Sequence, residues 1–286
     1  MATVVYIDGV RVASERASVS VFDRGFLHGD SVFESLRTYW GRPLLLGRHL
    51  VRLERSARSI GFALPVALSE LAAEVQCALR DAGTGERAVR VTVTRGTGEP
   101  GLDPTTAVQP TRVIAVRDAP PLQRSLDECV QIQTMARSMG RGHTAEAKHG
   151  SGLVGVLATA RARGQGAAEA IWISPRGDVL EGASSNVFVV QGRRVVTPPT
   201  DGRILAGVTR GRVLEIAPNV GCEALETSVS DEQLRTADEV FLTSALRGIV
   251  PVGAVDDVVI AGGRPGVVTR ALWSAFLTRA LQSDSS

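Results

Sequence analysis

Lys148 is the only lysine among the 32 lysine and arginine residues of this 286-residue chain. A guanidinium stays protonated and cannot attack a carbonyl, whereas an amine becomes a nucleophile once its pKa is lowered. An arginine-for-lysine bias by itself reflects genome composition, so the lone lysine gains meaning only beside other candidate groups. Its neighbours Ala147, Gly150 and Gly152 are small and would let a planar ligand approach. Lys148 is therefore a candidate for Schiff-base chemistry.

Five further residues could serve a ligand, although each has an ordinary structural explanation. Glu181 closes an expected strand and could hold a ring nitrogen protonated, but a lone glutamate at a strand end is usually a solvated charge. The pair Val208-Thr209 opens an expected helix, whose first N–H groups suit a phosphate. Arg52 lies on an arginine-rich helix, and Ser244 follows a strand; most residues of these types only meet solvent or form turns.

Composition and charge exclude several classes of protein. The formal net charge is +2, and the charges are interspersed, which argues against a nucleic-acid partner. The three cysteines lack C-x-x-C spacing, the histidines lack metal-ligand spacing, and neither a G-x-S-x-G nor a P-loop motif occurs. No apolar run reaches membrane-span length and no signal-peptide pattern begins the chain. We therefore expect a cytoplasmic enzyme without a metal or membrane partner.

The pattern of turns and apolar residues predicts two α+β domains with largely antiparallel sheets. Hairpins are expected at "VVYIDGVRVA" and at "SVFESLRTYW" followed by "PLLLGRHL". Helical spacing is found from Arg48 to Ile60, ended by Gly61, and in "LSELAAEVQCALRDAG", with Ser69 as the expected N-cap and Gly83 past its end. Pro120-Pro121 marks a break. The expected organisation is an N-terminal domain at 1–117, a linker at 118–125 and a C-terminal domain at 126–286.

The order of several motifs resembles that of the class IV aminotransferases, from about Tyr6 to Phe276. The motifs are "SVFDRGFLHGDSVFESLR", "HLVRLERSA", the Lys148 segment, "GDVLEGASSNVFVV", "ILAGVTRGRV" and "EVFLTSALRGIVPV". Class IV aminotransferases are pyridoxal 5′-phosphate (PLP) enzymes of fold type IV, and they include D-amino-acid and branched-chain aminotransferases and aminodeoxychorismate lyase. The resemblance implies a smaller N-terminal α/β domain and a larger C-terminal PLP-binding domain with a mainly antiparallel sheet. It also implies a homodimer.

The resemblance assigns roles to the matching positions. Lys148 matches the lysine that binds PLP as a Schiff base and shuttles the substrate proton, and Glu181 matches the carboxylate paired with the pyridine nitrogen. Arg52 matches the phosphate-binding arginine, helped by the helix start at Val208-Thr209. The remaining matches are Leu205 against the cofactor ring, Ser244 and Ala245 as cofactor contacts, and Phe33 and Leu246 as substrate contacts.

Departures from the family pattern leave two reactions open. Leu153 stands where branched-chain enzymes usually carry tyrosine, and "TGEPGLDPT" lacks the R-x-H clamp of many D-amino-acid enzymes. Ser244-Ala245-Leu246 is closer to aminodeoxychorismate lyase. Transamination between an amino acid, of D- or branched-chain type, and a 2-oxo acid is the first hypothesis. Formation of p-aminobenzoate and pyruvate is the second. A non-catalytic binding protein is disfavoured because Lys148, Glu181 and Arg52 are all present.

Overall fold

A computed structural model describes residues 3–122, 126–136 and 146–282. The chain divides into two compact units, one formed by Met1–Pro120 with Ala147–Gly152 and the other by Pro121–Glu146 with Leu153–Gln282. Residues 123–125 of the expected linker lie outside the described residues. Among the described residues, no helix has both the length and the apolar character needed to cross a membrane.

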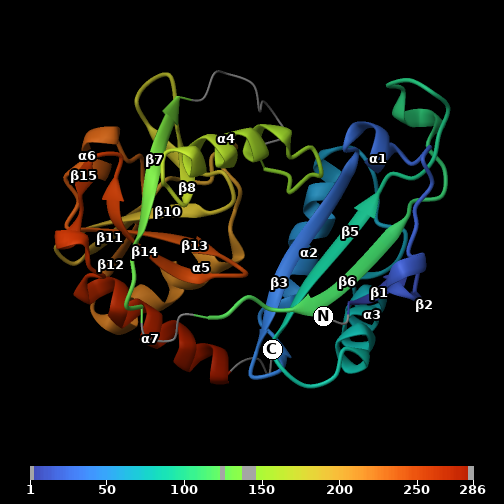
Figure 1. Ribbon diagram of the computed structural model, residues 1–286, viewed down its shortest axis with the longest axis horizontal. Coiled ribbons are helices and arrows are strands. Elements are labelled where there is room, and N and C mark those ends of the chain that lie inside the picture. The colour runs from blue at the N-terminus through green and yellow to red at the C-terminus, as the bar shows by residue number, and fades with distance from the viewer. Residues whose placement is uncertain (1–2, 123–125, 137–145, 283–286) are drawn as a thin grey trace. The chain divides into compact units, whose positions relative to one another are not determined.

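The first unit contains an antiparallel sheet with the strand order β2-β1-β6-β5-β3-β4. Figure 1 shows α2 and α3 against one face of this sheet, where they bury its core. The strands are β1 (Val4–Ile7), β2 (Val10–Val12), β3 (Ser31–Tyr39), β4 (Arg42–Pro43), β5 (Arg87–Thr94) and β6 (Arg112–Asp118). The helices are α1 (Arg24–His28), α2 (Leu46–Ser59), α3 (Leu68–Asp81) and the short 3-10 helices at Ser14–Arg16 and Pro104–Thr106.

Strand alternation determines what each face of this sheet carries. Val32 and Leu36 of β3 are fully buried on the face covered by α2 and α3, because alternate side chains of a strand point to opposite faces. Phe33, Ser35 and Arg37 therefore point to the other face. The first face forms the core of the unit, and the second remains for polar contacts.

The second unit contains a mixed, mainly antiparallel sheet in the order β12-β11-β10-β13-β14-β7-β8-β9, with β15 paired to β14. The pairs β11–β12, β14–β7 and β7–β8 are parallel. The strands are β7 (Val130–Ala136), β8 (Glu169–Ile173), β9 (Val179–Gly182), β10 (Asn186–Gln191), β11 (Arg194–Thr197), β12 (Glu223–Glu226), β13 (Glu239–Ser244), β14 (Gly248–Val255) and β15 (Val258–Val259).

Helices pack around this second sheet. They are α4 (Leu153–Gly164), α5 (Val208–Ile216), α6 (Asp231–Arg235), α7 (Val267–Gln282) and the 3-10 helices at Ala217–Val220 and Ala261–Gly263. A core of aliphatic side chains from β7, β9, β10, β13 and β14 lies on one face of the sheet. On β13 the alternate residue Phe241 stacks on Phe188 of β10 with ring centroids 4.8 Å apart, so this pair belongs to the opposite face.

The predicted two-domain α+β class is confirmed, with two local corrections. The run "PLLLGRHL" does not continue as a strand, because β4 ends at Pro43 and α2 begins at Leu46. Ser69 is not an N-cap; α3 begins at Leu68, and the N-cap is Ala67, which provides no side-chain hydrogen bond.

Candidate functional site

The predicted site residues are divided between the two units. Phe33 and Arg52 belong to the first unit. Lys148 belongs to it as well, because residues 147–152 pack with that unit rather than with their neighbours in sequence. The second unit contains the other predicted residues: Glu181, Leu205, Val208, Thr209, Ser244, Ala245 and Leu246.

The backbone around Lys148 is fixed along the edge of β3. The Phe33 N–H donates to the Lys148 carbonyl at 2.9 Å, and the Gly150 N–H donates to the Ser31 carbonyl at 2.7 Å. The Lys148 N–H donates to Oγ of Ser56, a buried residue of α2, at 3.1 Å. Because its backbone is held by a strand and a helix, the lysine is presented from a rigid support.

The Lys148 amine lies beside a basic, aromatic part of the sheet. Its Nζ is 4.7 Å from the ring centroid of Phe33, and Cζ of Arg90 is 3.8 Å from the same centroid. Ser35 pairs with Arg90 across the strands, so Phe33 and Arg90 share the face opposite the core. Two cations beside one aromatic ring suit an anionic, partly apolar ligand.

Arg52 is part of a buried charged cluster at the junction of β3 and α2. Its Nε donates to Oε1 of Glu34 at 2.6 Å, and one terminal nitrogen donates to Oε2 at 2.7 Å. His49 Nδ1 lies 2.7 Å from the same Oε2. Glu34 has no exposed area, and His49 is 2% exposed, so both partners are removed from water. The guanidinium is therefore held in one orientation by a bidentate pair.

The protonation states in this cluster follow from its geometry. Burial raises the pKa of Glu34, but hydrogen bonds from His49 and Arg52 outweigh it and lower that pKa to about 2. Burial lowers the pKa of His49; the hydrogen bond to Glu34 opposes this, and the charges of Arg52 and Lys148 add to it. An ionised Glu34 can only accept hydrogen bonds. The neutral His49 therefore carries its proton on Nδ1 and donates a hydrogen bond from it to Glu34.

In the second unit, Glu181 and Leu205 are directly connected. The Leu205 N–H donates to Oε2 of Glu181 at 3.0 Å, and the Leu205 carbonyl accepts from Nδ2 of Asn186 at 2.9 Å. Glu181 is only 7% exposed although it lies near the end of β9, which closes at Gly182. A buried carboxylate with so little solvent contact suits the protonated nitrogen of a heteroaromatic ring.

The start of α5 has the features expected of a phosphate site. Its N-cap, Gly207, provides no side-chain cap, and helix geometry leaves the first N–H groups, including that of the buried Thr209, without intrahelical acceptors. A Cβ on Gly207 would lie 1.9 Å from Oδ1 of Asn186, so any larger residue would displace the Asn186 side chain or the helix start. Thr243 pairs with Asn186 across the strands, and its buried hydroxyl has no hydrogen-bond partner among the described residues. These residues fit a phosphate ester.

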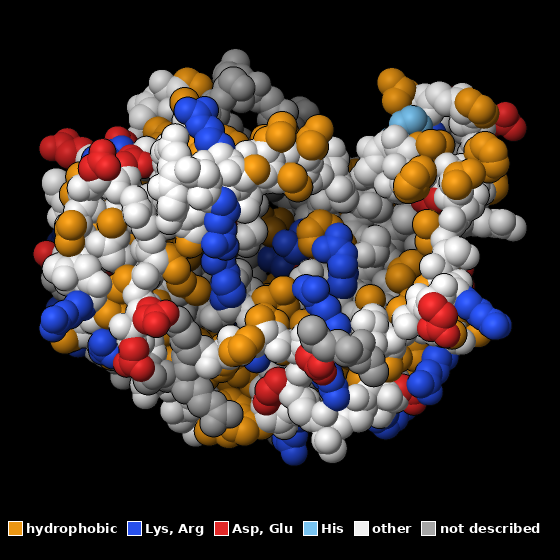
Figure 2. Space-filling view, viewed as in Figure 1, with side chains coloured by type: hydrophobic (Ala, Val, Ile, Leu, Met, Phe, Trp, Pro, Cys, Tyr) orange, Lys and Arg blue, Asp and Glu red, His pale blue; other side chains and the backbone are white. Residues whose placement is uncertain are grey.

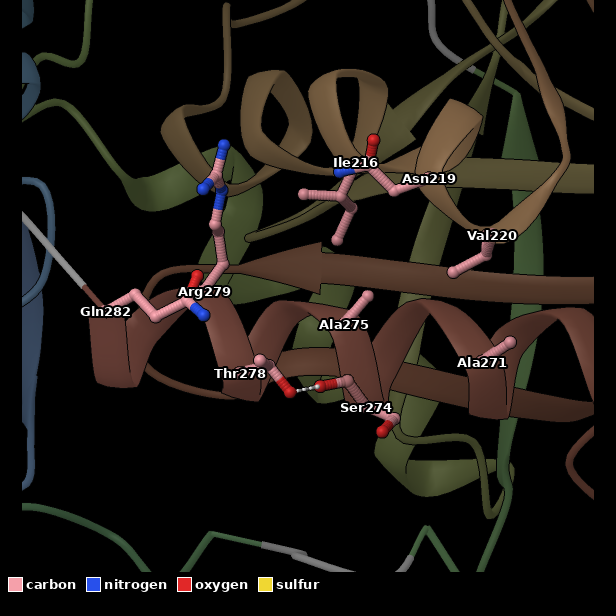
Figure 3. A pocket seen from close by; sticks show the side chains of 9 residues that line it. All are labelled: Ile216, Asn219, Val220, Ala271, Ser274, Ala275, Thr278, Arg279 and Gln282. Atoms are coloured by element: carbon pink, nitrogen blue, oxygen red, sulfur yellow. Dashed lines mark hydrogen bonds between the residues drawn. The ribbon is translucent and has the colours of Figure 1, made fainter.

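The chain also has a groove that contains none of the predicted site residues. Its volume is about 490 Å³, and Figure 3 shows its walls, which come from the end of α5, the following 3-10 helix and α7. The lining residues are Ile216, Asn219, Val220, Ala271, Ser274, Ala275, Thr278, Arg279 and Gln282. Four lining residues are apolar, four are uncharged and polar, and Arg279 is charged.

Comparison with known proteins identifies the family. Residues 31–255 match the family described as amino-transferase class IV. A putative branched-chain-amino-acid aminotransferase of Methanocaldococcus jannaschii is 36% identical, over 95% of this chain and 94% of that protein. Aminodeoxychorismate lyase of Bacillus subtilis is 31% identical (94% and 92%), and D-alanine aminotransferase of Staphylococcus epidermidis is 32% identical (99% and 99%).

Solved structures have the same fold. The branched-chain amino acid aminotransferase of Escherichia coli superimposes with a TM-score of 0.92 at 27% identity, covering 100% of this chain and 97% of that one. Another branched-chain amino acid aminotransferase, solved with pyridoxamine 5′-phosphate, has the same TM-score at 26% identity, covering 100% of this chain and 96% of that one. The chain belongs to the class IV aminotransferases, a family of PLP-dependent enzymes.

Three polar residues near the candidate site were not predicted from the sequence. Glu34 and His49 form the buried cluster with Arg52, and Arg90 lies over Phe33. A signal for Glu34 exists in the sequence, because β3 places it between Val32 and Leu36 on the apolar face. A charge in an apolar stripe indicates a buried pair. No comparable signal marks Arg90, which is one arginine among many.

Proposed function

We propose that this enzyme transfers an amino group between an amino acid, of D- or branched-chain type, and a 2-oxo acid, with PLP as cofactor. The observation that carries the proposal is the attachment of the sole lysine to β3 and α2 by its backbone. A catalytic amine needs such a fixed support, whereas a solvent-exposed surface lysine does not. Family membership supplies the reaction class.

Roles for individual residues follow from their chemistry and surroundings. When bound, PLP supplies an aldehyde and an electron-withdrawing ring that stabilises negative charge at the substrate Cα. Lys148 would hold the cofactor through Nζ and, as a free amine, would take the proton from the substrate Cα and deliver it to C4′ of the cofactor. Glu181 holds a proton on the ring nitrogen, and Leu205, fixed by its N–H to Glu181, packs against the ring.

Phosphate binding is divided among several groups in the proposal. The N–H groups of Val208 and Thr209 and the charge of Arg52 bind the phosphate ester. Ser244 and Ala245 contribute from the turn between β13 and β14, and Leu246 of the same turn contacts the substrate together with Phe33. Arg90, beside Phe33, suits the carboxylate that every 2-oxo acid carries.

The second candidate is aminodeoxychorismate lyase, which forms p-aminobenzoate and pyruvate. The sequence Ser244-Ala245-Leu246 and the 31% identical Bacillus subtilis lyase favour it. The purified protein should be incubated with alanine or glutamate of either hand plus 2-oxo acids, and separately with aminodeoxychorismate. Amino transfer without p-aminobenzoate supports the first candidate. Formation of p-aminobenzoate without amino transfer rejects it in favour of the lyase.

We also propose a homodimer. Figure 2 shows hydrophobic side chains exposed over α4. They are Leu153, Val154, Val156 and Leu157, each between 57% and 67% exposed, whereas Ala158 and Ala162 form the buried side of the helix. An apolar helix face of this kind usually marks a protein interface.

Light scattering should give a mass in solution twice the 30.2 kDa chain mass. Leu157→Glu should lower the measured mass, whereas the control Arg161→Ala should not. A monomeric wild type contradicts the proposal.

A further inference from the structure

Glu169 is a buried carboxylate at the start of β8 that holds the turn after Glu181. Its Oε1 accepts the Ser184 N–H at 2.7 Å and the hydroxyls of Ser184 and Ser185 at 2.9 Å each. Glu169 itself is 3% exposed. One carboxylate oxygen therefore collects three hydrogen bonds from the segment that joins β9 to β10, immediately beyond the carboxylate proposed to face the ring nitrogen.

This turn is closed tightly around the carboxylate. The Gly182 N–H donates to the Ser185 carbonyl at 2.7 Å. A Cβ added to Gly182 would lie 2.8 Å from Oε1 of Glu169 and 2.3 Å from Oγ of Ser185, so any larger residue would force the turn away. Gly182, adjacent to Glu181, is thus packed closely against the carboxylate of Glu169.

The second carboxylate oxygen of Glu169, Oε2, accepts a hydrogen bond from a different turn. Arg247 donates to Oε2 through a terminal nitrogen, and its Nε lies 3.4 Å from Oγ of Ser244. Arg247 lies with Ala245 and Leu246 in the turn between Ser244 of β13 and Gly248 of β14. The side chain of Arg247 is about one-third exposed, whereas that of Glu169 is almost fully buried. The ion pair thus links a buried group to a turn at the surface.

We propose that Glu169 is a positioning residue that couples the two turns. One oxygen fixes the turn behind Glu181, and the other, through Arg247, fixes the turn that presents Ser244, Ala245 and Leu246. This inference rests on the proposed function, because that function assigns cofactor and substrate contacts to both turns. Neither Glu169 nor Arg247 touches the reacting atoms in this proposal; they set where other groups lie.

Two substitutions remove the hydrogen bond from Arg247 to Glu169 and leave an oxygen for the two serines. Arg247→Met removes the bond to the second turn but leaves a buried charge unpaired, which destabilises the fold. Glu169→Gln keeps an oxygen for the serines and replaces the acceptor for Arg247 with an NH₂ group. The double variant Glu169→Gln/Arg247→Met removes both charges, so it should recover thermal stability relative to Arg247→Met. Arg194→Met, which breaks the exposed pair with Glu223, is the matched control.

The measurements must distinguish positioning from a purely structural role. Thermal unfolding and affinity for pyridoxine 5′-phosphate, which has the phosphate but no aldehyde, are measured on the cofactor-free protein. The kcat and KM for amino transfer are measured on the loaded enzyme. We expect Arg247→Met and the double variant to weaken pyridoxine 5′-phosphate binding and raise the amino-acid KM roughly threefold to tenfold, with kcat within about twofold of wild type. Stability should recover in the double variant, but KM should not.

Two results would overturn the coupling. If the double variant recovers wild-type KM and ligand affinity together with its stability, Glu169 and Arg247 act only on folding. If Arg247→Met matches Arg194→Met in ligand affinity and KM while wild type transfers amino groups normally, the positioning role alone is rejected. A wild-type protein without amino transfer would instead reject the proposed function, and with it this role of Glu169.

Discussion

Arg52 donates to both oxygens of the buried carboxylate of Glu34, at 2.6 and 2.7 Å. The neutral ring of His49 adds a third hydrogen bond to that carboxylate. Since Glu34 lies on the core face of β3 and Arg52 on α2, this pair joins the sheet to its covering helix. The same pair fixes the guanidinium that we propose binds the cofactor phosphate.

The first prediction concerns the stability of the protein in acid. The pKa of Glu34 is lowered from 4.5 to about 2 in the folded protein, so its stabilisation is fully present above about pH 4.5. It is lost as the pH falls toward 2. We expect the difference in unfolding free energy between wild type and Glu34→Gln to shrink by on the order of 3 kcal/mol over that interval. Urea unfolding followed by circular dichroism from pH 7 to pH 2 measures it.

Glu54→Gln is the control for this experiment, because Glu54 lies on α2 but pairs only with the exposed Arg58 among the ion pairs found in the described residues. Its difference from wild type should stay small and nearly independent of pH. A constant difference between wild type and Glu34→Gln from pH 7 to pH 2 would show that Glu34 has an ordinary pKa.

The second prediction concerns the helix start at α5. Gly207→Ala places a methyl group against Oδ1 of Asn186 and should displace the first turn of the helix. We expect affinity for pyridoxine 5′-phosphate to fall by about tenfold or more and the thermal midpoint to drop. The control is Gly211→Ala, inside the same helix, where nothing lies within 4 Å of the added Cβ. It should raise stability by about 0.5–1 kcal/mol and leave affinity unchanged. Equal affinities in the two variants would argue against a phosphate at this helix.

The third prediction concerns the charge of Glu181. Glu181→Gln keeps an acceptor for the Leu205 N–H but cannot stabilise a protonated ring nitrogen. We expect kcat for amino transfer to fall roughly a hundredfold or more, with cofactor affinity changed only a few-fold. The exposed Glu223→Gln is the control. A kcat within twofold of wild type for Glu181→Gln would mean that the ring nitrogen is served by another group.

Local patterns in the sequence were sufficient to predict the elements in which buried apolar residues recur at regular spacing. Leu50, Leu53 and Ala57 share the apolar face of α2, and Gly61 follows the helix with a φ of 81°, as its spacing predicted. The N-cap of α3 was misplaced because Ser69 is a favourable cap residue, yet the chain is already helical at Leu68. Helix existence follows from periodicity, whereas the exact first residue depends on tertiary packing.

Two features could not be read from chain order or composition. Residues 147–152 pack with the first unit. Chain order could not predict this, because Lys148 and Gly150 pair with residues of β3 that lie more than one hundred positions away in the chain. Strand β14 was not predicted; it lies between β13 and β7 and contains Pro251, opposite Phe241, although proline is unusual in a central strand. The domain limits 1–117 and 126–286 and the roles of the site residues stay predictions.

The most direct test of the account uses the absence of any second lysine. The N-terminal amine and Nζ of Lys148 are the chain's two primary alkyl amines. The PLP-loaded enzyme is treated with borohydride, which makes a reversible amine–aldehyde bond permanent, and the peptides are mapped by mass spectrometry. We predict one pyridoxyl group on the peptide containing Lys148, none in Lys148→Arg, and loss of amino transfer in that variant. An unlabelled Lys148 peptide, or full turnover by Lys148→Arg, would contradict the account.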